Sequence, residues 1–469
     1  MKIDTVIINN FRCFSHLKVT FHPHMTVLIA PNGTGKTTIL DAVRIALWPF
    51  VKGFDLGSQA GKSATIQIDD VRLRRIKNTM EPVLPSTVTA LTRDFFGHGT
   101  HQWCQYREQI KPRTQMKGDK ETNRLTQYAK KLQAAVYEDA AAGQDAVTLP
   151  LMVYLGTGRL WYQGRYGSEA EDKQLDNSVY SRFWGYQNCL TAISGYKQFE
   201  TWFSWVFRSF RELQIAGLES PLNEEERSAL ENFSAAIDVV QKAVNALTRE
   251  QTGWFDLQYR ASAGQQLVME HEEQGYIPLD MLSDGLRNMV AMVSDIAFRC
   301  IKLNPHLGKY AAEKTTGIVL IDEVDMFLHP SWQQRVLPSL ADAFPELQFI
   351  VTTHSPQVIS AVHSDSVRSI GENTSGEMIA GKPLANTYGV PSHQVMHSVM
   401  LVDPQPPVKE KNDLLRLTEL VDQGMSDTPE AIELMEKLTT KLGEPHPQLR
   451  RLQRSIIRQR NLAKGNQQQ

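Results

Sequence analysis

The residues with the clearest chemistry lie in a glycine-bearing loop, Ala-Pro-Asn-Gly-Thr-Gly-Lys-Thr-Thr, at positions 30–38. Its two glycines lack a Cβ, so the backbone can turn tightly and direct N–H groups at phosphate oxygens. Lys36 is expected to reach the β- and γ-phosphates of ATP, and Thr37 to bind Mg²⁺. The predicted nucleotide contacts in this loop are Asn32, Gly33, Thr34, Gly35, Lys36, Thr37 and Thr38.

The elements around this loop fit a phosphate site. The run at 26–29 predicts a strand before the loop, and apolar residues at helical spacing from Ile39 to Leu47 predict a helix after it. A phosphate-binding loop requires this order of strand, loop and helix. Ala30 stands where the pattern GxxxxGK[ST] has its first glycine, and we expect this change to tune the loop geometry without abolishing it.

Two further apolar runs end in residues that can act on a phosphate. Residues 317–321 read as a buried parallel strand and are followed by Asp322 and Glu323. Asp322 is expected to bind Mg²⁺ through water, and Glu323 to act as the base that orients the attacking water. The run at 347–353 ends at His354, which is placed to contact the γ-phosphate, although a lone histidine is more often structural.

A second helix end is predicted downstream of the phosphate loop. Leu-Ser-Asp-Gly at 282–285 precedes a helical pattern through Ile296. Ser283 is a good N-cap and Gly285 permits close backbone approach, so this end can hold phosphate; a plain helix cap is the alternative. Because one nucleotide rarely needs two such ends from one subunit, we predict a homodimer that shares each ATP between the phosphate loop of one copy and Ser283 and Gly285 of the other.

Two arginines leave alternatives open. Arg12 lies between two short β patterns and is a candidate nucleotide contact, with an exposed arginine on a β-turn as the alternative. Arg159 ends a Gly-Thr-Gly-Arg loop after the apolar run at 149–155. It would be presented to the nucleotide or to a neighbouring subunit, or it would lie in a plain tight turn.

Composition limits the class of protein. The chain has 469 residues and a net charge of -2, so no global basic field indicates nucleic acid, and any such contact must be a local patch. The four cysteines are scattered without a CxxC pair, which argues against a zinc site or a disulfide framework. No export signal and no run of 18 apolar residues is present, so we expect no membrane insertion and a cytoplasmic location.

The order of these motifs resembles that of the ABC-type ATPases: phosphate loop, Leu-Ser-Asp-Gly, strand ending in Asp-Glu, strand ending in His. The resemblance implies that Ser283 and Gly285 form the signature motif and that His354 is the switch histidine. Asp284 departs from the second glycine of the LSGGQ signature. Asn-Phe-Arg at 10–12 resembles the RecF and SMC branch, in which this arginine contacts the nucleotide.

A closer resemblance is carried by GTGRLW at 156–161, LSDGLRNM at 282–289, LNPHLG at 303–308, LHP at 328–330 and TTHSPQ at 352–357. In these motifs the chain is similar to the PtuA-type ATPases of Septu and retron anti-phage defence systems. The resemblance implies a partner HNH nuclease that is PtuB-like, with nucleic acid contacted through that complex. The main alternative is a RecF-like DNA-binding clamp in DNA repair. An OLD-type nuclease and a transporter ATPase fit less well.

The expected fold class is α/β. We predict an ABC-type P-loop ATPase head at 1–390, interrupted by a largely helical insertion at about 80–275, and a C-terminal helical region at 391–469 for assembly or partner docking. A β-rich stretch at 63–76 should continue the first sheet. Three short helical patterns after residue 404 would pack on the head or offer a docking surface. The last of them carries Arg450, Arg451, Arg454, Arg458 and Arg460, for RNA, DNA, an acidic partner or solvent.

Overall fold

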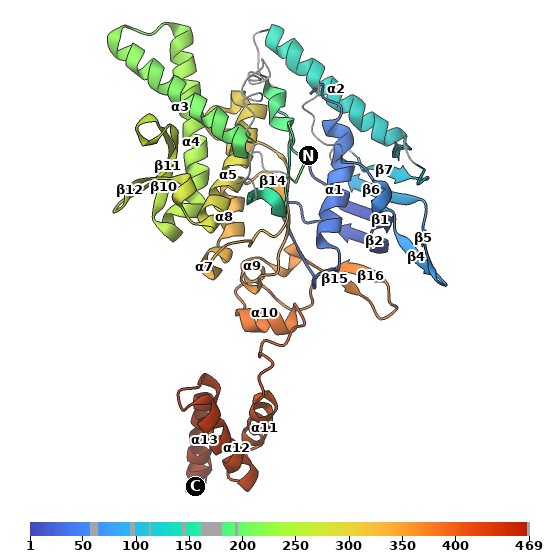
Figure 1. The fold of residues 1–469 in the computed structure, drawn as a ribbon, viewed down its shortest axis with the longest axis vertical. Helices are drawn as coiled ribbons and strands as arrows, with labels where there is room; N and C mark the ends of the chain where they lie inside the picture. Colours follow the sequence, from blue (N-terminus) through green and yellow to red (C-terminus); the bar gives the residue numbers. More distant parts are fainter. Residues whose placement is uncertain are drawn as a thin grey trace. The chain divides into compact units, whose positions relative to one another are not determined.

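The computed structural model describes residues 1–56, 64–93, 99–111, 114–142, 147–160, 181–192 and 196–466. The chain divides into two compact units, Met1–Met400 and Leu401–Gln469. The first unit contains two larger sheets and most of the helices, and the second contains three helices (Figure 1). Within the described ranges, no helix combines the length and the apolar character needed to cross a membrane.

A six-stranded sheet forms the centre of the first unit. Its strands run parallel except for one edge strand, which pairs antiparallel with its neighbour. In spatial order they are β16 (Met378–Gly381), β15 (Val367–Glu372), β3 (Met25–Ile29), β14 (Leu347–Thr352), β13 (Gly317–Ile321) and β9 (Leu151–Leu155). The last four are buried along their whole length, as expected for parallel strands covered on both faces. Their carboxyl ends meet at one edge, where open α/β sheets bind ligands.

A five-stranded antiparallel sheet is the second layer. It consists of β2 (Phe14–Thr20), β1 (Thr5–Phe11), β6 (Ser86–Thr92), β7 (His101–Arg107) and β8 (Lys117–Gly118), in that order. Helix α1 (Lys36–Val51) contacts strands of both sheets and is buried on nearly every side. Trp103 of β7 donates its indole N–H to the carbonyl of Ala46 at 2.8 Å, which ties the second sheet to this helix. The helix that starts at the phosphate loop is therefore a central part of the core of the unit.

Two long helices form an antiparallel hairpin at one side of the first unit, and a third packs beneath them (Figure 1). They are α3 (Tyr196–Glu219), α4 (Glu224–Thr252) and α5 (Asp284–Leu303). Aromatic residues at helical spacing in α3, among them Phe199 and Phe203, are fully buried. These side chains build core, as their spacing predicts.

The stretch at about 80–275, predicted as a largely helical insertion, contains long helices and also supplies strands to both larger sheets. Its strands β6 and β7 belong to the five-stranded sheet, and β9 is an edge of the six-stranded sheet. Its helical parts are α2 (Lys120–Ala141) and the hairpin of α3 and α4. A three-stranded sheet follows α4, made of β10 (Trp254–Arg260), β11 (Gln266–His271) and β12 (Gly275–Pro278). The other α-helices that the structure describes in the first unit are short: α6 (Ala311–Lys314), α7 (Pro330–Gln333), α8 (Val336–Ala343), α9 (Pro356–Ser360) and α10 (Ser392–Ser398).

The β-rich stretch expected at 63–76 does not extend the first sheet as predicted. Its first part holds a 3-10 turn at Ile68–Asp70, and only the bridge between Phe11 and Val71 reaches β1. The strand that follows, β4 (Leu73–Ile76), pairs with β5 (Thr79–Pro82) in a separate two-stranded hairpin. The prediction is therefore wrong for most of this stretch, because only Leu73–Ile76 forms a strand and its partner is β5.

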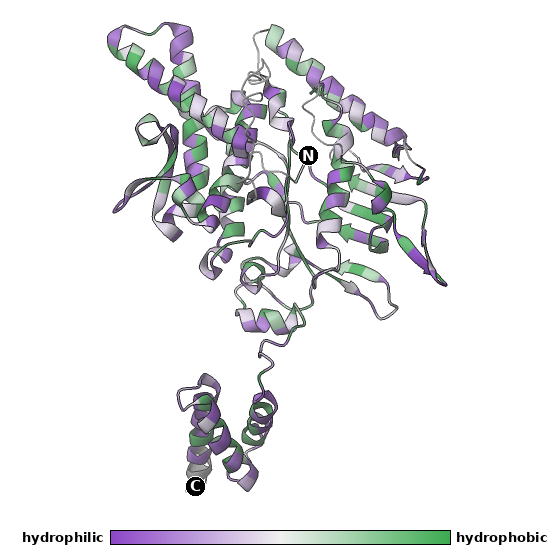
Figure 2. Cartoon of the chain, viewed as in Figure 1, coloured by the Kyte–Doolittle hydropathy of each residue, from purple (hydrophilic) through white to green (hydrophobic). Residues whose placement is uncertain are grey.

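The second unit has a small core of its own. Helices α11 (Lys411–Asp422), α12 (Pro429–Leu442) and α13 (Pro447–Asn466) each carry an apolar and a polar side (Figure 2). Their buried residues are Leu414, Leu417, Leu420, Val421, Ala431, Leu438, Leu449 and Leu452. The Thr428 hydroxyl caps α12 by accepting from the amide of Ala431. The three helices thus bury their apolar sides against one another.

Two leucines of α11 test this core. Leu417 is fully buried, so Leu417→Ala should lower the free energy of unfolding of the second unit by about 2–5 kcal/mol. Leu415 is 46% exposed, and Leu415→Ala in the same helix should change it by less than about 0.5 kcal/mol. Hydrogen exchange of the amides in α11–α13 measures both. Equal protection in the two variants would mean that these helices are not held together by the core described.

Candidate nucleotide site

The phosphate loop has the backbone that its glycines predict. Gly33 and Gly35 both have positive φ, 80° and 103°. Gly35 meets a second constraint, since a Cβ there would lie 2.5 Å from the Phe14 ring and 2.7 Å from the Cys13 sulfur. Ala30 lacks positive φ, so its methyl group fits without strain. The turn between β1 and β2 therefore lies directly against the loop.

Lys36 folds back over this loop. Its ammonium donates to the carbonyls of Ala30 at 2.9 Å and Pro31 at 3.3 Å. Burial lowers the pKa of Lys36, while Asp322, Glu323 and neighbouring carboxylates act to raise it. The cation is held at the start of α1, where amide N–H groups also point outward, and together they form a positive cradle for phosphate.

Asp322 is a buried carboxylate at the end of β13, with only 3% of its surface exposed. One of its oxygens accepts from the hydroxyl of Thr37 at 2.9 Å, and the other accepts from the hydroxyl of Thr352 at 2.6 Å. The sequence motifs at 36–37 and 322 are thus in direct contact although they lie 285 positions apart. Thr352, at the end of β14, is a member of the site that the sequence did not reveal.

The oxygen atoms of Asp322 and Thr37 are suitable ligands for Mg²⁺. The ion prefers hard oxygen ligands, and it is usually bound by one or two carboxylates together with substrate phosphates. Thr37 and Asp322 supply a hydroxyl and a carboxylate within hydrogen-bond distance of each other. When bound, Mg²⁺ would neutralise charge on the β- and γ-phosphates.

Glu323 has an unusual backbone for its residue type. Its φ is +46°, a left-handed conformation that glycine and asparagine adopt more readily. Its N–H donates to the Thr352 hydroxyl at 2.8 Å, and its carbonyl accepts from the Arg159 guanidinium at 2.7 Å. Both backbone groups are therefore fixed, and the half-buried side chain leaves the strand end in a set direction. A strained residue held on both sides is typical of functional sites.

Arg159 does not face a nucleotide or a neighbouring subunit. It is 4% exposed, and its guanidinium donates to the carbonyls of Gly156 at 3.1 Å, Asp322 at 2.6 Å and Glu323 at 2.7 Å. Its Nε donates to Asn288 of α5 at 2.8 Å. Burial lowers the pKa of Arg159 to about 10, so it stays protonated near pH 7. Its role is to hold the backbone on which Asp322 and Glu323 sit. Trp161 of the same motif lies outside the described residues.

His354 lies among the same charges. Its pKa is lowered from 6.5, first by burial and then by the charge of Lys36, while Asp325, Glu323 and Asp322 oppose this shift. The neutral imidazole is therefore favoured, and it can donate to or accept from a phosphate group. Thr353 before it donates to Asp325 at 2.5 Å, and Ser355 after it caps α9. The structure thus brings His354, Lys36, Asp322 and Glu323 together.

Within the described chain, the second helix end makes no direct bond to the phosphate loop. Ser283 caps α5 by position, is exposed, and makes no side-chain bond to its own helix. A Cβ on Gly285 would overlap the carbonyl oxygen of Phe327, so this glycine is explained by packing within the subunit. Asn288 donates to the carbonyl of Met326 at 2.9 Å and so holds the start of α5 against the same segment as Gly285 does. Among the described residues, no hydrogen bond or ion pair joins Ser283 or Gly285 to the phosphate loop.

Arg12 is held beside the phosphate loop by two carboxylates. It contacts Asp41 of α1 at 2.5 Å and Asp70 at 2.8 Å. Burial acts to lower the pKa of Arg12, but Asp41 and Asp70 outweigh it, and the pKa is raised. Cys13 next to it lies 3.9 Å from the carbonyl of Thr34 in the loop. A contact between Arg12 and the nucleotide stays a prediction.

Comparison with known proteins agrees with this geometry. The sequence model of a family described as "AAA domain" matches residues 5–251. The chain belongs to this AAA-domain family. A second model, "AAA domain, putative AbiEii toxin, Type IV TA system", matches residues 184–360. The chain is an ATPase.

Individual relatives of this AAA-domain protein are distant. It is 24% identical to "Retron Ec83 probable ATPase" of Escherichia coli, over 89% of this chain and 79% of that one. It is 33% identical to "Septu protein PtuA" of Bacillus mycoides (strain KBAB4) over 29% of this chain and 19% of that one. An SMC head bound to the C-winged helix domain of ScpA covers 81% of this chain at 12% identity, with a TM-score of 0.48; 98% of that chain is covered. The resemblance to retron and Septu ATPases is confirmed.

Thr352 offers a test of how the AAA-domain site is held. Thr352→Val keeps shape but removes the hydroxyl shared by Asp322 and the amide of Glu323. Because partners that orient a ligand typically change activity by about 10–100-fold, we expect a comparable loss in ATP turnover with ATP still bound. Steady-state hydrolysis and nucleotide binding measure the two effects. Thr201→Val on the exposed face of α3 is the matched control, and equal turnover in both variants would contradict the role of Thr352.

Proposed function

We propose that the chain is the ATP-hydrolysing component of a bacterial anti-phage defence complex, and that its nucleotide state controls a separate HNH nuclease. The observation that supports this most is the set Lys36, Thr37, Asp322, Glu323 and His354 at one sheet edge, in a chain similar along most of its length to a retron ATPase. Cellular ATP would hold the nuclease quiet, and loss of nucleotide during infection would release it.

The proposed hydrolysis uses each member of the set once. Lys36 and the amides of the loop would bind the β- and γ-phosphates, and Asp322 with Thr37 would hold Mg²⁺. Glu323 accepts a proton from the water that attacks the γ-phosphorus, and His354 donates to a γ-phosphate oxygen. Glu323→Gln keeps hydrogen bonding but removes the base. Such a variant would bind ATP and remain in the ATP-bound state.

We further propose that two copies share two ATP molecules. Ser283 is exposed and caps no amide of its own helix, so its hydroxyl is available to a second nucleotide. Two large apolar side chains near it are exposed as well, Met281 and Phe327. An exposed phosphate-binding helix end flanked by apolar side chains suits an interface between copies.

Complementation between variants tests the shared site. A heterodimer of a Lys36→Ala copy and a Ser283→Arg copy retains one composite site with an intact loop and an intact helix end. It should hydrolyse ATP, at about half the wild-type rate per dimer if the two sites act independently, whereas either variant alone should be inactive. Turnover by the doubly tagged heterodimer is the measurement.

The control is a pair of variants whose substituted residues would act on the same nucleotide from the same subunit. Lys36→Ala combined with Asp322→Asn leaves no complete site in any dimer, because both residues act on the same nucleotide in one subunit. This pair should not recover activity. Recovery here, or no recovery in the first pair although heterodimers form, would exclude a site shared between copies.

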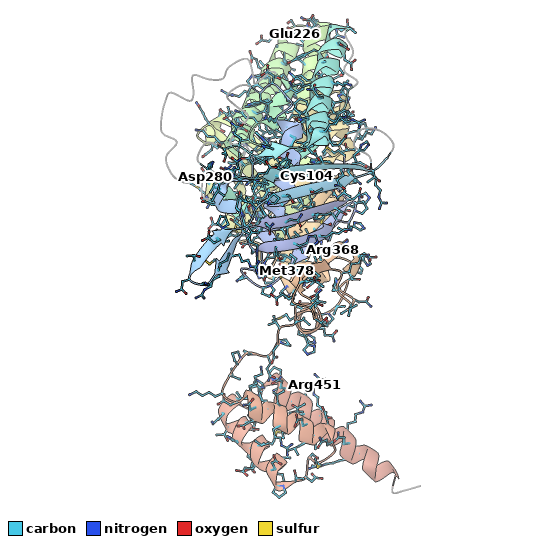
Figure 3. All side chains as sticks on the ribbon, turned by 90° about the vertical axis from the view of Figure 1, so that its right-hand side faces the viewer. Cys104, Glu226, Asp280, Arg368, Met378 and Arg451 are labelled. Atoms are coloured by element: carbon cyan, nitrogen blue, oxygen red, sulfur yellow. The ribbon has the colours of Figure 1, made fainter. Side chains whose placement is uncertain are left out.

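The second unit is the proposed docking region for the partner. Helix α13 carries five arginines and no acidic residue. Some acidic residues of α11 and α12 form ion pairs within the unit, such as Glu430 with Arg416 and Asp413 with Lys437, and Arg460 of α13 pairs with Asp427. Arg451 points away from the helices in Figure 3. An acidic face on the partner would complement this surface.

The control of the nuclease is tested by reconstitution. We expect cleavage of DNA or RNA by the pair to fall as ATP rises. Moving a two-state assembly from 1:99 to 99:1 takes about 5.5 kcal/mol of differential binding, or roughly 2.8 per nucleotide with two sites. Lys36→Ala should release cleavage at all ATP concentrations, and Glu323→Gln should suppress it at low ATP. Cleavage that rises with ATP would reverse the sign of control.

Two outcomes would remove the mechanism. Cleavage indifferent to both ATP and Lys36→Ala would mean that nucleotide state controls nothing in the pair. A chain ending at residue 404 that still binds the nuclease would exclude docking on the second unit. A RecF-like clamp is the alternative function, and the neighbouring reading frame separates the two: a nuclease gene supports the defence role, and a replication gene supports the clamp.

A further inference from the structure

The hairpin of β4 and β5 stands apart from both larger sheets. Its strands pair only with each other, with Arg74 opposite Glu81 and Arg75 opposite Met80. It projects from the body of the first unit in two perpendicular views (Figures 1 and 3). A two-stranded hairpin is marginally stable in water without a further surface to pack on. Nearly all side chains of the two strands are exposed, so both faces of the ribbon are accessible to a partner outside the subunit.

The hairpin concentrates positive charge. Four cations fall within six residues, namely Arg72, Arg74, Arg75 and Lys77, against the single acid Glu81 across the turn. No ion pair joins any of these four cations to another described residue. The whole chain carries a net charge of -2, so this patch is a local reversal of sign. A local reversal of this kind favours a polyanionic partner.

Apolar side chains are interleaved with these charges. Leu73, Ile76 and Met80 are each exposed by more than half of their surface. Exposed apolar groups in a basic ribbon can contact thymine methyl groups or base edges, while the cations contact phosphates. A purely electrostatic surface would not need them.

The root of the hairpin is rigid. Arg72 donates its backbone N–H to Asn10 at 3.0 Å, and Val83 donates to Arg72 at 2.8 Å. Just before it, Asp70 accepts from the backbone N–H of Arg12 at 2.7 Å and from the Arg12 side chain at 2.8 Å. The ribbon thus projects from the same turn that lies against the phosphate loop. Its direction is fixed by the fold.

We propose that the β4–β5 hairpin is a contact element for double-stranded DNA. The major groove of B-form DNA is about 12 Å wide and admits a two-stranded β-ribbon. The major groove of an A-form RNA duplex is too narrow for side chains to read. The width of the ribbon therefore selects DNA over duplex RNA. This inference does not depend on control of a nuclease by ATP.

The test is binding of the full chain to a fluorescein-labelled 25-base-pair DNA duplex, followed by anisotropy from 50 to 200 mM salt. The variant Arg74→Ala/Arg75→Ala/Lys77→Asn removes three charges, and asparagine suits the positive φ of 54° at position 77. It should weaken binding at least tenfold. The slope of log K against log salt should fall in size by about 2.7, from roughly 0.9 for each lost phosphate contact.

Two further variants test whether the apolar side chains of the hairpin contribute to binding and whether the location of the positive charge matters. Ile76→Ser/Met80→Ser should weaken binding while leaving the salt slope unchanged. Lys120→Ala/Lys130→Ala/Lys131→Ala removes the same charge from exposed positions of α2 and should keep the affinity within about twofold. All of these residues are exposed, so the variants should fold, and an unchanged ATP affinity confirms it.

Three results would overturn the proposal. The first is no binding of the duplex by the wild-type chain at 50 mM salt. The second is equal affinity and salt slope in the hairpin charge variant and the wild type, which would point to a protein that pairs with the free strand edges instead. The third is equal affinity for an RNA duplex of the same sequence, which would contradict the groove argument.

Discussion

The buried carboxylate of Asp322 is the point on which the site depends. A charge with 3% exposure must be compensated by hydrogen bonds, and here two hydroxyls from different elements supply them. Thr37 comes from the first turn of α1, and Thr352 comes from the end of β14. These bonds connect the helix and two central strands at the edge where their ends meet. The backbone ladder fixes β13 against β14, and the Asp322 side chain joins the end of this pair to the first turn of α1.

Charge around this carboxylate is unevenly balanced. Asp322, Glu323 and Asp325 act on the two cations Lys36 and Arg159. The guanidinium of Arg159 donates hydrogen bonds to three backbone carbonyls and to Asn288. It therefore positions the strand end, and few of its N–H groups are left to bind a ligand. A polyphosphate would add negative charge to a region already rich in it. Compensation must then come with the ligand as a metal ion, or from cations outside the pair.

The sequence identified the residues whose signal is local. The phosphate loop and the Asp-Glu pair stand directly after apolar strands, and the order of elements alone places them. The loop after the strand at 149–155 singles out Arg159, but its role could not be predicted, because its partners include backbone carbonyls up to 164 positions away. Thr352 looked like an ordinary β-branched residue of a buried strand. Of the β-rich stretch at 63–76, only Leu73–Ile76 forms a strand, and β-propensity does not name the strand with which a segment pairs.

The left-handed backbone conformation of Glu323 lowers the stability of the folded protein, and this has a consequence for directed evolution. A residue with a Cβ in this conformation gives up roughly 1–2 kcal/mol compared with glycine. A replacement by glycine or asparagine would relax the backbone while deleting the carboxylate. Under the proposed role of Glu323 as the base, selection for heat resistance alone would therefore favour variants that are more stable but hydrolyse ATP poorly. At position 323, selection for thermal stability and selection for ATP hydrolysis would therefore favour different residues.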